Sequence, residues 1–173
     1  RILAALEWPA VYGITNAEDS DERAFLARAE HALAQGLRLV QLRERSWPLA
    51  RRTALAAALV PLAHRHGARV LWNGTAEEAR AAGCDGVHWT AQRLREATAR
   101  PQGLVCAASC HCAAEIAQAG RLDLDFAVMG PVAATPTHPE ATPLGWDAFA
   151  RLVALARLPV YALGGLRRDD LPT

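Results

Sequence analysis

The stretch at residues 37–45, Leu-Arg-Leu-Val-Gln-Leu-Arg-Glu-Arg, joins an apolar segment to a run of polar side chains. Its first part is apolar enough for a buried strand, while Gln41, Arg43 and Arg45 alternate along its end. A period of two places these three side chains on one face of an extended segment. Two cations that point the same way favour an anion, and a phosphate or pyrophosphate is the natural one. The alternative is a solvated strand end at which Glu44 forms a surface salt bridge.

Similar apolar segments recur along the whole chain, and helical patterns separate them. Strands are predicted over residues 9–15, 37–45, 69–73, 86–89, 104–109, 126–130 and 160–165. Helices are predicted over residues 22–35, 48–66, 75–82, 91–99, 113–119 and 146–156, and a further helix from residue 166. This alternation, at about 20–30 residues per unit, is typical of βα crossovers, and near-continuous apolar strands are typical of a parallel sheet.

Two architectures fit this pattern: an open doubly wound sheet and a (β/α)8 TIM barrel. No Gly-x-Gly-x-x-Gly follows the first strand, which argues against a dinucleotide-binding fold. Polar residues follow nearly every strand, which favours a barrel with its site at the carboxyl ends of the strands. We therefore predict a single α/β domain over residues 1–173, a (β/α)8 barrel that lacks the eighth unit in this chain.

Local signals set several of the expected helix bounds. Ser20 or Asp21 is a candidate cap for the first helix, and Pro48 suits the start of the second. Thr75 suits the cap of the third. Pro61 falls late in the second helix and is expected to kink or shorten it.

The composition excludes several classes of protein. The chain has 51% hydrophobic residues and a net charge of +1, so no general basic surface for nucleic acid or a membrane is expected. No apolar run approaches the roughly 20 residues of a membrane span, and no signal peptide is recognisable, so a cytoplasmic protein is predicted. The first residue is Arg1, which suggests a piece of a longer polypeptide.

The four cysteines predict reduced thiols rather than a disulfide framework. Their spacing is irregular, and the sequence carries no secretion signal. The run Cys110-His111-Cys112 invites a metal interpretation. Zinc sites usually show two-residue gaps and a second pair of ligands, and none follows here, so no metal site is predicted.

Other candidate site residues also follow predicted strands. The ends of the strands offer, in chain order, Asn73, His88, Ser109, His111, Thr135, Thr137, Gly164 and Gly165. Glycines at such a position let backbone N–H groups approach a phosphate. His111 is either an acid/base group or a loop histidine bonded to a carbonyl, whereas His88, between Val87 and Trp89, suits a packed core position.

Several short motifs, in order and spacing, resemble the thiamin-phosphate synthase/TenI family over essentially the whole chain. They are Tyr12-Gly13-Ile14-Thr15, Val40 to Arg45, Gly86-Val87-His88, Ser109-Cys110-His111, Gly130-Pro131, Thr135-Pro136-Thr137, Pro143-Leu144-Gly145 and Pro159 to Gly165. The family fold is a (β/α)8 barrel. The resemblance implies that Gln41, Arg43 and Arg45 hold the pyrophosphate of an aminopyrimidine. It also implies that Thr135, Thr137, Gly164 and Gly165 bind a thiazole phosphate.

The resemblance differs in detail between the two branches of the family. The synthase branch implies Mg²⁺ held by two aspartates, and Gly74 and Arg93 stand at those positions here. The TenI branch resembles this chain in Asn73-Gly74 and in the run from Arg43 to Ser46. It implies a thiazole tautomerase in which His111 moves a proton without a metal or other cofactor.

On that basis a TenI-like thiazole tautomerase is the favoured prediction, with two alternatives. One is thiamin-phosphate synthase, which joins aminopyrimidine pyrophosphate to thiazole phosphate and would need Mg²⁺. The other is a non-catalytic ligand-binding domain, because related domains often follow a Nudix hydrolase on one polypeptide. The partners expected are therefore a phosphorylated thiazole or pyrimidine, a fused Nudix domain and a second copy in a homo-oligomer.

Overall fold

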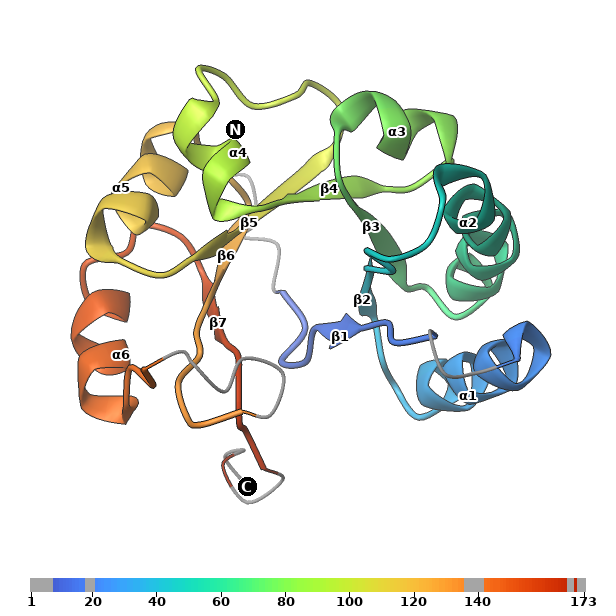
Figure 1. Ribbon diagram of the computed structural model, residues 1–173, viewed down its shortest axis with the longest axis horizontal. Helices are drawn as coiled ribbons and strands as arrows, with labels where there is room; N and C mark the ends of the chain where they lie inside the picture. Colours follow the sequence, from blue (N-terminus) through green and yellow to red (C-terminus); the bar gives the residue numbers. More distant parts are fainter. Residues whose placement is uncertain (1–7, 18–20, 136–141, 168–169, 171–173) are drawn as a thin grey trace. The chain divides into compact units, whose positions relative to one another are not determined.

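The chain folds into two compact units of alternating strands and helices, Arg1–His88 and Trp89–Thr173 (Figure 1). The computed structural model describes residues 8–17, 21–135, 142–167 and 170. The α/β class and the parallel strands predicted from the sequence are confirmed.

The first unit contains a parallel sheet in the order β1-β2-β3-β4, with one helix after each of its first three strands. Its elements are β1 (Gly13–Ile14), α1 (Glu22–Ala34), β2 (Leu39–Leu42), α2 (Leu49–Arg65), β3 (Arg69–Asn73), α3 (Ala76–Ala81) and β4 (Gly86–Trp89). The last residue of β4 begins the second unit. In register, Ile14 lies beside Gln41, Gln41 beside Leu71, and Asn73 beside His88.

The second unit contains a parallel sheet in the order β5-β6-β7. Its elements are α4 (Ala91–Glu96), β5 (Val105–Cys110), α5 (Ala113–Arg121), β6 (Phe126–Met129), α6 (Trp146–Val153) and β7 (Val160–Ala162). All four residues of β6 are buried, whereas no residue of α6 or β7 is.

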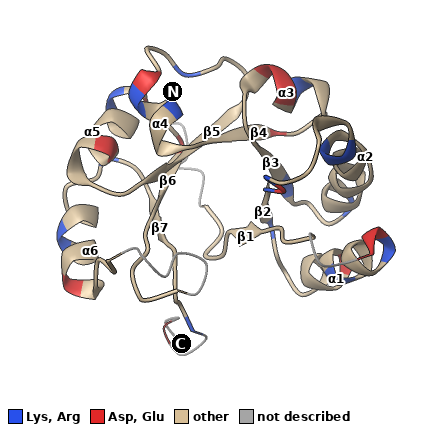
Figure 2. Cartoon of the chain, in the orientation of Figure 1, with Lys and Arg blue, Asp and Glu red and all other residues tan. Residues whose placement is uncertain are grey.

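Both sheets are apolar and the helices carry the charge. Figure 2 shows Asp, Glu, Lys and Arg chiefly on the helices. In the first unit, Leu39, Leu55 and Trp72 have no exposed surface, and in the second Phe126 and Met129 have none. Burying such side chains contributes about 1.5–3 kcal/mol each, which is the main force that holds helices against a sheet.

Most of the predicted local signals are confirmed. Asp21 caps α1 by accepting from the Ala24 amide, and Thr75 forms a capping box with Glu78 at the start of α3. Pro48 precedes the first residue of α2. None of the helices in the described residues is long and apolar enough to cross a membrane.

Three predicted elements need correction or lie outside the described residues. The first strand was expected over residues 9–15, but only Gly13–Ile14 pairs with β2, and Val11 is 49% exposed. Pro61 does not end α2, which continues to Arg65 because its buried apolar face, including Leu59 and Leu62, offsets the lost backbone hydrogen bond. The helix expected from residue 166 falls largely on residues that the structure does not describe.

Candidate functional site

In the first unit, several polar side chains meet at the carboxyl ends of the strands. Gln41 is only 2% exposed, and its Oε1 accepts a 2.8 Å hydrogen bond from Nδ2 of Asn73. Because this bond engages Oε1, the donor that remains on the Gln41 amide is Nε2. The two residues lie on neighbouring strands, and this bond brings them into direct contact.

Arg43 and Arg45 follow β2 and place two positive charges at this end of the sheet. Gln41 is buried, Arg43 is half-buried and Arg45 is exposed. The Arg43 amide donates a 2.9 Å hydrogen bond to Oγ1 of Thr15, which fixes the backbone at that point. Both guanidinium groups act on the same buried imidazole, that of His88, as its pKa shows.

His88 is a buried member of this polar group. It is 1% exposed, and its Nδ1 is hydrogen-bonded to the Tyr12 hydroxyl at 3.2 Å. Burial, and then the positive charges of Arg43 and Arg45, lower its pKa from 6.5 to about 3. His88 is therefore neutral at physiological pH and acts as a hydrogen-bonding group.

In the second unit, His111 stands on a buried carboxylate. The His111 side chain is 59% exposed, and its Nδ1 lies 3.3 Å from Oε2 of Glu115, whose side chain is 6% exposed. Glu115 also accepts from the His111 amide at 2.7 Å and from Arg95. Burial alone would raise the pKa of Glu115, but these hydrogen bonds outweigh it, so the pKa is lowered and the carboxylate stays ionised.

The loops after β6 and β7 form a backbone frame. The Val132 and Ala133 amides donate to the carbonyls of Leu163 and Gly164 at 2.8 and 3.0 Å. Gly164 has a φ of +95°, and a side chain there would meet Cβ of Pro131 at 2.6 Å, so only glycine fits. Neither the Gly164 nor the Gly165 amide has an acceptor within the described part of the chain, so both can donate to an anion.

The other site residues predicted from the sequence are Ser109, Thr135 and Thr137. Ser109 lies within β5 and Thr135 after β6, both half-buried. Thr137 lies outside the described residues. All four cysteines are free thiols, and burial raises the pKa of Cys84, Cys106 and Cys110 to about 12, which makes them poor nucleophiles and metal ligands.

The residues near Asn73 do not fit the Mg²⁺ that the synthase branch implies. At Gly74, a side chain would meet Nε1 of Trp72 at 2.6 Å and also Oε2 of Glu78. That Glu78 oxygen already accepts from Trp72 Nε1 and from the Thr75 amide, both at 3.0 Å. Within the described residues, no group of three or more His, Cys, Asp or Glu could hold a metal ion. We therefore derive no chemical step through a metal.

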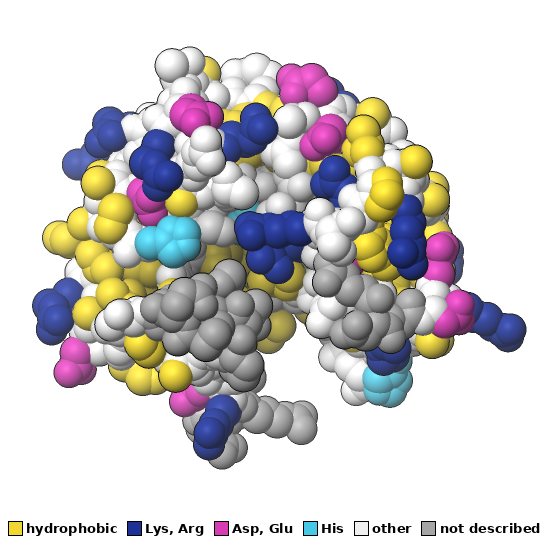
Figure 3. Space-filling model, in the orientation of Figure 1, with side chains coloured by type: hydrophobic (Ala, Val, Ile, Leu, Met, Phe, Trp, Pro, Cys, Tyr) yellow, Lys and Arg dark blue, Asp and Glu magenta, His cyan; other side chains and the backbone are white. Residues whose placement is uncertain are grey.

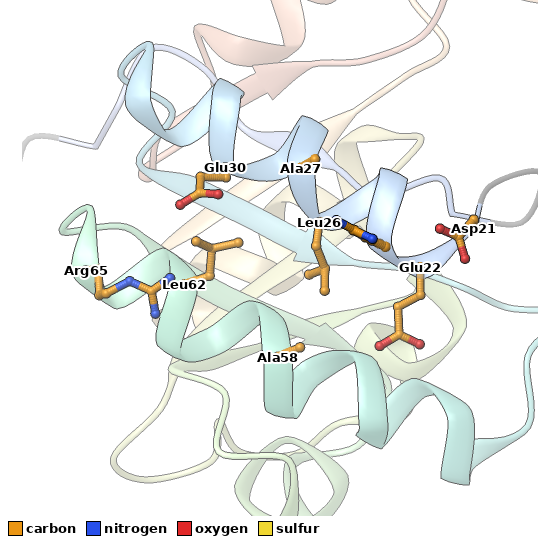
Figure 4. Close-up of a pocket in the computed structure, with 9 residues that line it drawn as sticks. Asp21, Glu22, Leu26, Ala27, Glu30, Ala58, Leu62 and Arg65 are labelled. Carbon is orange, nitrogen blue, oxygen red and sulfur yellow. The ribbon is translucent and has the colours of Figure 1, made fainter.

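A hollow of about 690 Å³ lies between α1 and α2, away from the polar side chains described above (Figure 4). Leu26 and Leu62 point into the space between the two helices. Asp21, Glu22 and Glu30 border it on the α1 side. Arg23 and Arg65 line it as well, so its border carries charges of both signs. Figure 3 shows charges of both signs interspersed over the visible face, as the net charge of +1 predicts.

Several site residues were not identified from the sequence. The partner of His88, Tyr12, could have been found from the register, because inward-facing residues on parallel strands share one parity. Glu115 lies four residues after His111, in the first turn of α5, and this spacing brings the two side chains together. Glu44 was considered only as a surface ion-pair partner, which is wrong because it is 1% exposed.

Comparison with known proteins identifies relatives over most of the chain. A family model described as thiamine monophosphate synthase matches residues 11–173. A Geobacter sulfurreducens protein named "Putative thiamine-phosphate synthase" is 38% identical over 94% of this chain and 78% of its own length. A Gloeobacter violaceus thiamine-phosphate synthase is 39% identical over 82% of this chain, which spans 42% of that protein.

Among solved structures, thiamine phosphate pyrophosphorylase from Pyrococcus furiosus matches with a TM-score of 0.75. It is 22% identical and is covered over 76% of its length by 92% of this chain, which supports the α/β fold.

These findings correct the functional prediction. The favoured TenI-like tautomerase is wrong, because the relatives carry the names of synthases and nothing among them supports an isomerase. Two short matches, Asn73-Gly74 and the run from Arg43 to Ser46, carried that choice. Agreement over 167 residues outweighs them. The chain belongs to the thiamine monophosphate synthase family.

Proposed function

We propose that this protein joins an aminopyrimidine pyrophosphate to a thiazole phosphate, as a thiamine-phosphate synthase. The names of its relatives support this reaction, and the cationic end of β2 is the feature of the chain that carries it. The finer prediction of a (β/α)8 barrel forms part of the same proposal, with the site at the carboxyl ends of the strands.

The reaction exchanges one bond for another. The carbon–oxygen bond between the pyrimidine methylene and the pyrophosphate breaks, and both electrons leave with the pyrophosphate. The thiazole ring nitrogen then supplies its lone pair to the same carbon. The leaving group gains negative charge, so groups that stabilise this charge lower the barrier.

In the first unit, Arg43 and Arg45 supply the charges that bind the pyrophosphate. The planar guanidinium of an arginine can donate two parallel hydrogen bonds to phosphate oxygens, which also fixes the orientation of the phosphate. Gln41, oriented by Asn73, adds a neutral donor. His88 remains uncharged beside them, because its pKa is about 3, and so leaves their charge balance unchanged at neutral pH.

In the second unit, the thiazole phosphate is assigned to the loops after β6 and β7. Gly164 and Gly165 offer backbone N–H donors, and Thr135 and Thr137 carry hydroxyl groups. Ser109 adds a further hydroxyl at the end of β5. His111, placed by Glu115, can donate a proton or a hydrogen bond to a phosphate oxygen.

The test is a direct coupling assay. Wild-type protein is supplied with aminopyrimidine pyrophosphate and thiazole phosphate, with and without added Mg²⁺, and thiamin phosphate is measured by mass spectrometry. We expect product and released pyrophosphate in equal amounts. Replacing Arg43 by Ala should lower kcat/KM about 100-fold, since a charge-assisted contact contributes about 1.5–3 kcal/mol and orientation adds to it.

Arg23→Ala serves as the matched control, because Arg23 is an exposed arginine on α1 in the same unit. It should leave kcat/KM within about twofold of wild type. A wild-type protein that forms no product above the uncatalysed rate would refute the proposed reaction.

A further inference from the structure

A buried carboxylate lies between the two arginines of the β2 end. Glu44 is 1% exposed, whereas Arg45 beside it is exposed. Its Oε1 accepts a 3.0 Å hydrogen bond from the Ala17 amide, and its Oε2 has no hydrogen-bond partner in the described part of the chain. Burying a charged group is costly, so one retained with only half its acceptors used needs a compensating role.

Glu44 belongs to a short series of hydrogen bonds that joins two loops. The Thr15 amide donates to the Gln41 carbonyl at 2.9 Å, and the Arg43 amide donates to Oγ1 of Thr15 at 2.9 Å. The bond from Ala17 to Glu44 completes the series. The three bonds extend the β1–β2 ladder beyond its last pair, Ile14 and Gln41, and the second and third use side-chain oxygens in place of carbonyls.

The backbone of Arg43 lies inside this series. The hydroxyl of Thr15 holds the Arg43 amide. The next residue, Glu44, is bonded to Ala17 through its own side chain. Ala17 has no exposed surface, so the anchor is itself fixed in the core. Arg45 follows Glu44 in a turn that the Trp47 amide closes by donating to the Glu44 carbonyl at 3.2 Å, so the anchor at Glu44 also holds the turn that carries Arg45.

We propose that Glu44 is a positioning residue that holds Arg43 and Arg45 in the geometry that binds pyrophosphate. The identity of the anion rests on the proposed function, but the anchoring does not. Glu44 touches no substrate. It acts through the backbone between the two arginines, where a small displacement of a bidentate group costs much of its binding.

Two other roles would leave different signatures. If Glu44 only balanced the charge of the arginines, removing its charge would strengthen anion binding, whatever replaced it. If Glu44 only stabilised the fold, its variants would lower Tm without changing the affinity of the folded protein. The anchoring role requires the Oε1 acceptor and not the charge.

Three variants separate these roles, with inorganic pyrophosphate as the titrant in calorimetry and Tm measured in parallel. Glu44→Ala removes the acceptor and the charge, and Glu44→Gln removes the charge alone. Thr15→Val removes the other anchor. Glu30→Ala, an exposed glutamate on α1, is the matched control.

We expect Glu44→Ala to weaken pyrophosphate binding about tenfold or more, and Glu44→Gln to restore it to within about threefold of wild type. Thr15→Val should resemble Glu44→Ala. In the coupling assay, Glu44→Ala should raise KM for the pyrimidine pyrophosphate and leave KM for thiazole phosphate unchanged.

Tighter binding in both Glu44 variants, or unchanged binding in Glu44→Ala, would overturn the proposal. If Glu44→Ala does not fold, equal binding by Thr15→Val and wild type overturns it instead. Calorimetry that detects no binding of pyrophosphate to the wild-type protein overturns it as well. A protein whose pyrophosphate binding depends on Glu44 as proposed, but which forms no thiamin phosphate, refutes only the proposed reaction.

Discussion

The two units use the same device at the amino ends of their strands and different devices at the carboxyl ends. Asp85 donates its amide to the Val70 carbonyl at 2.9 Å and accepts from the Val70 amide at 2.7 Å. Asp125 does the same with Cys106, at 2.9 and 2.8 Å. Each aspartate therefore joins the start of one strand to the start of the strand before it.

At the carboxyl ends the resemblance between the units stops. The first unit gathers the buried side chains of Gln41 and His88 there, and hydrogen bonds to Asn73 and Tyr12 hold them. The second presents backbone loops and an exposed histidine on a buried glutamate. A repeated contact serves folding and a divergent one serves ligands, and the carboxyl ends are where enzymes of this class place their chemistry.

The largest expected difference between the two units is the pH at which each loses stability. The pKa of His88 is about 3 in the folded protein and 6.5 in the unfolded chain. Between these two pH values the unfolded chain therefore binds a proton that the folded chain does not. This contribution to the free energy of unfolding is present above pH 6.5 and is lost as the pH falls toward 3. For Glu115, the lowered pKa means a loss that begins only below about 4.5.

We therefore expect the first unit to lose stability at a higher pH than the second. Amide hydrogen exchange measures this, with Val40 and Val70 reporting on the first unit and Cys106 and Ala127 on the second. His88→Gln should flatten the pH dependence between 6.5 and 4 in the first unit alone. Equal loss of protection in both units over that range would remove the distinction.

The sequence predicted the parallel strands and the helices between them, because both follow from patterns that neighbouring residues repeat. It did not predict that Gln41 and Asn73 are bonded, since that depends on the register of two strands. Glu44 and Glu115 were missed because a charged residue in isolation suggests a surface, and only the tertiary structure shows its burial. Function was misassigned for a related reason, since short motifs vary within a family more than its whole-chain pattern does.

The second-largest effect concerns the glycine frame of the second unit. Gly164→Ala combines a positive φ of 95° with a contact of 2.6 Å to Pro131. Gly103→Ala is the matched control, since its φ is 73° and nothing lies within 4 Å of the added carbon. We expect losses of about 3 kcal/mol and about 1 kcal/mol in urea unfolding. Comparable losses would mean that the loops adapt, and that the frame does not require glycine.

The hydrogen bond inside the first unit should have a moderate effect. Gln41→Leu leaves Nδ2 of Asn73 without its acceptor and should cost about 1–3 kcal/mol. Adding Asn73→Leu should recover part of that loss, because the orphaned donor is removed as well. Urea unfolding of the two single variants and the double variant gives the coupling energy. Additive losses would show that the two amides do not act as a unit.

The smallest effect tests the shared device at the amino ends. Asp→Asn keeps an oxygen that can accept from the neighbouring amide, so what each variant removes is the charge. Asp125 pairs with Arg100, both 26% exposed, whereas Asp85 pairs with His64, which is 48% exposed. Asp125→Asn should therefore cost about 1 kcal/mol and Asp85→Asn about 0.5 kcal/mol at pH 7, with both losses reduced by salt. If Asp85→Asn proves the more damaging in urea unfolding, the two aspartates are not equivalent, and the amino ends differ between the units as the carboxyl ends do.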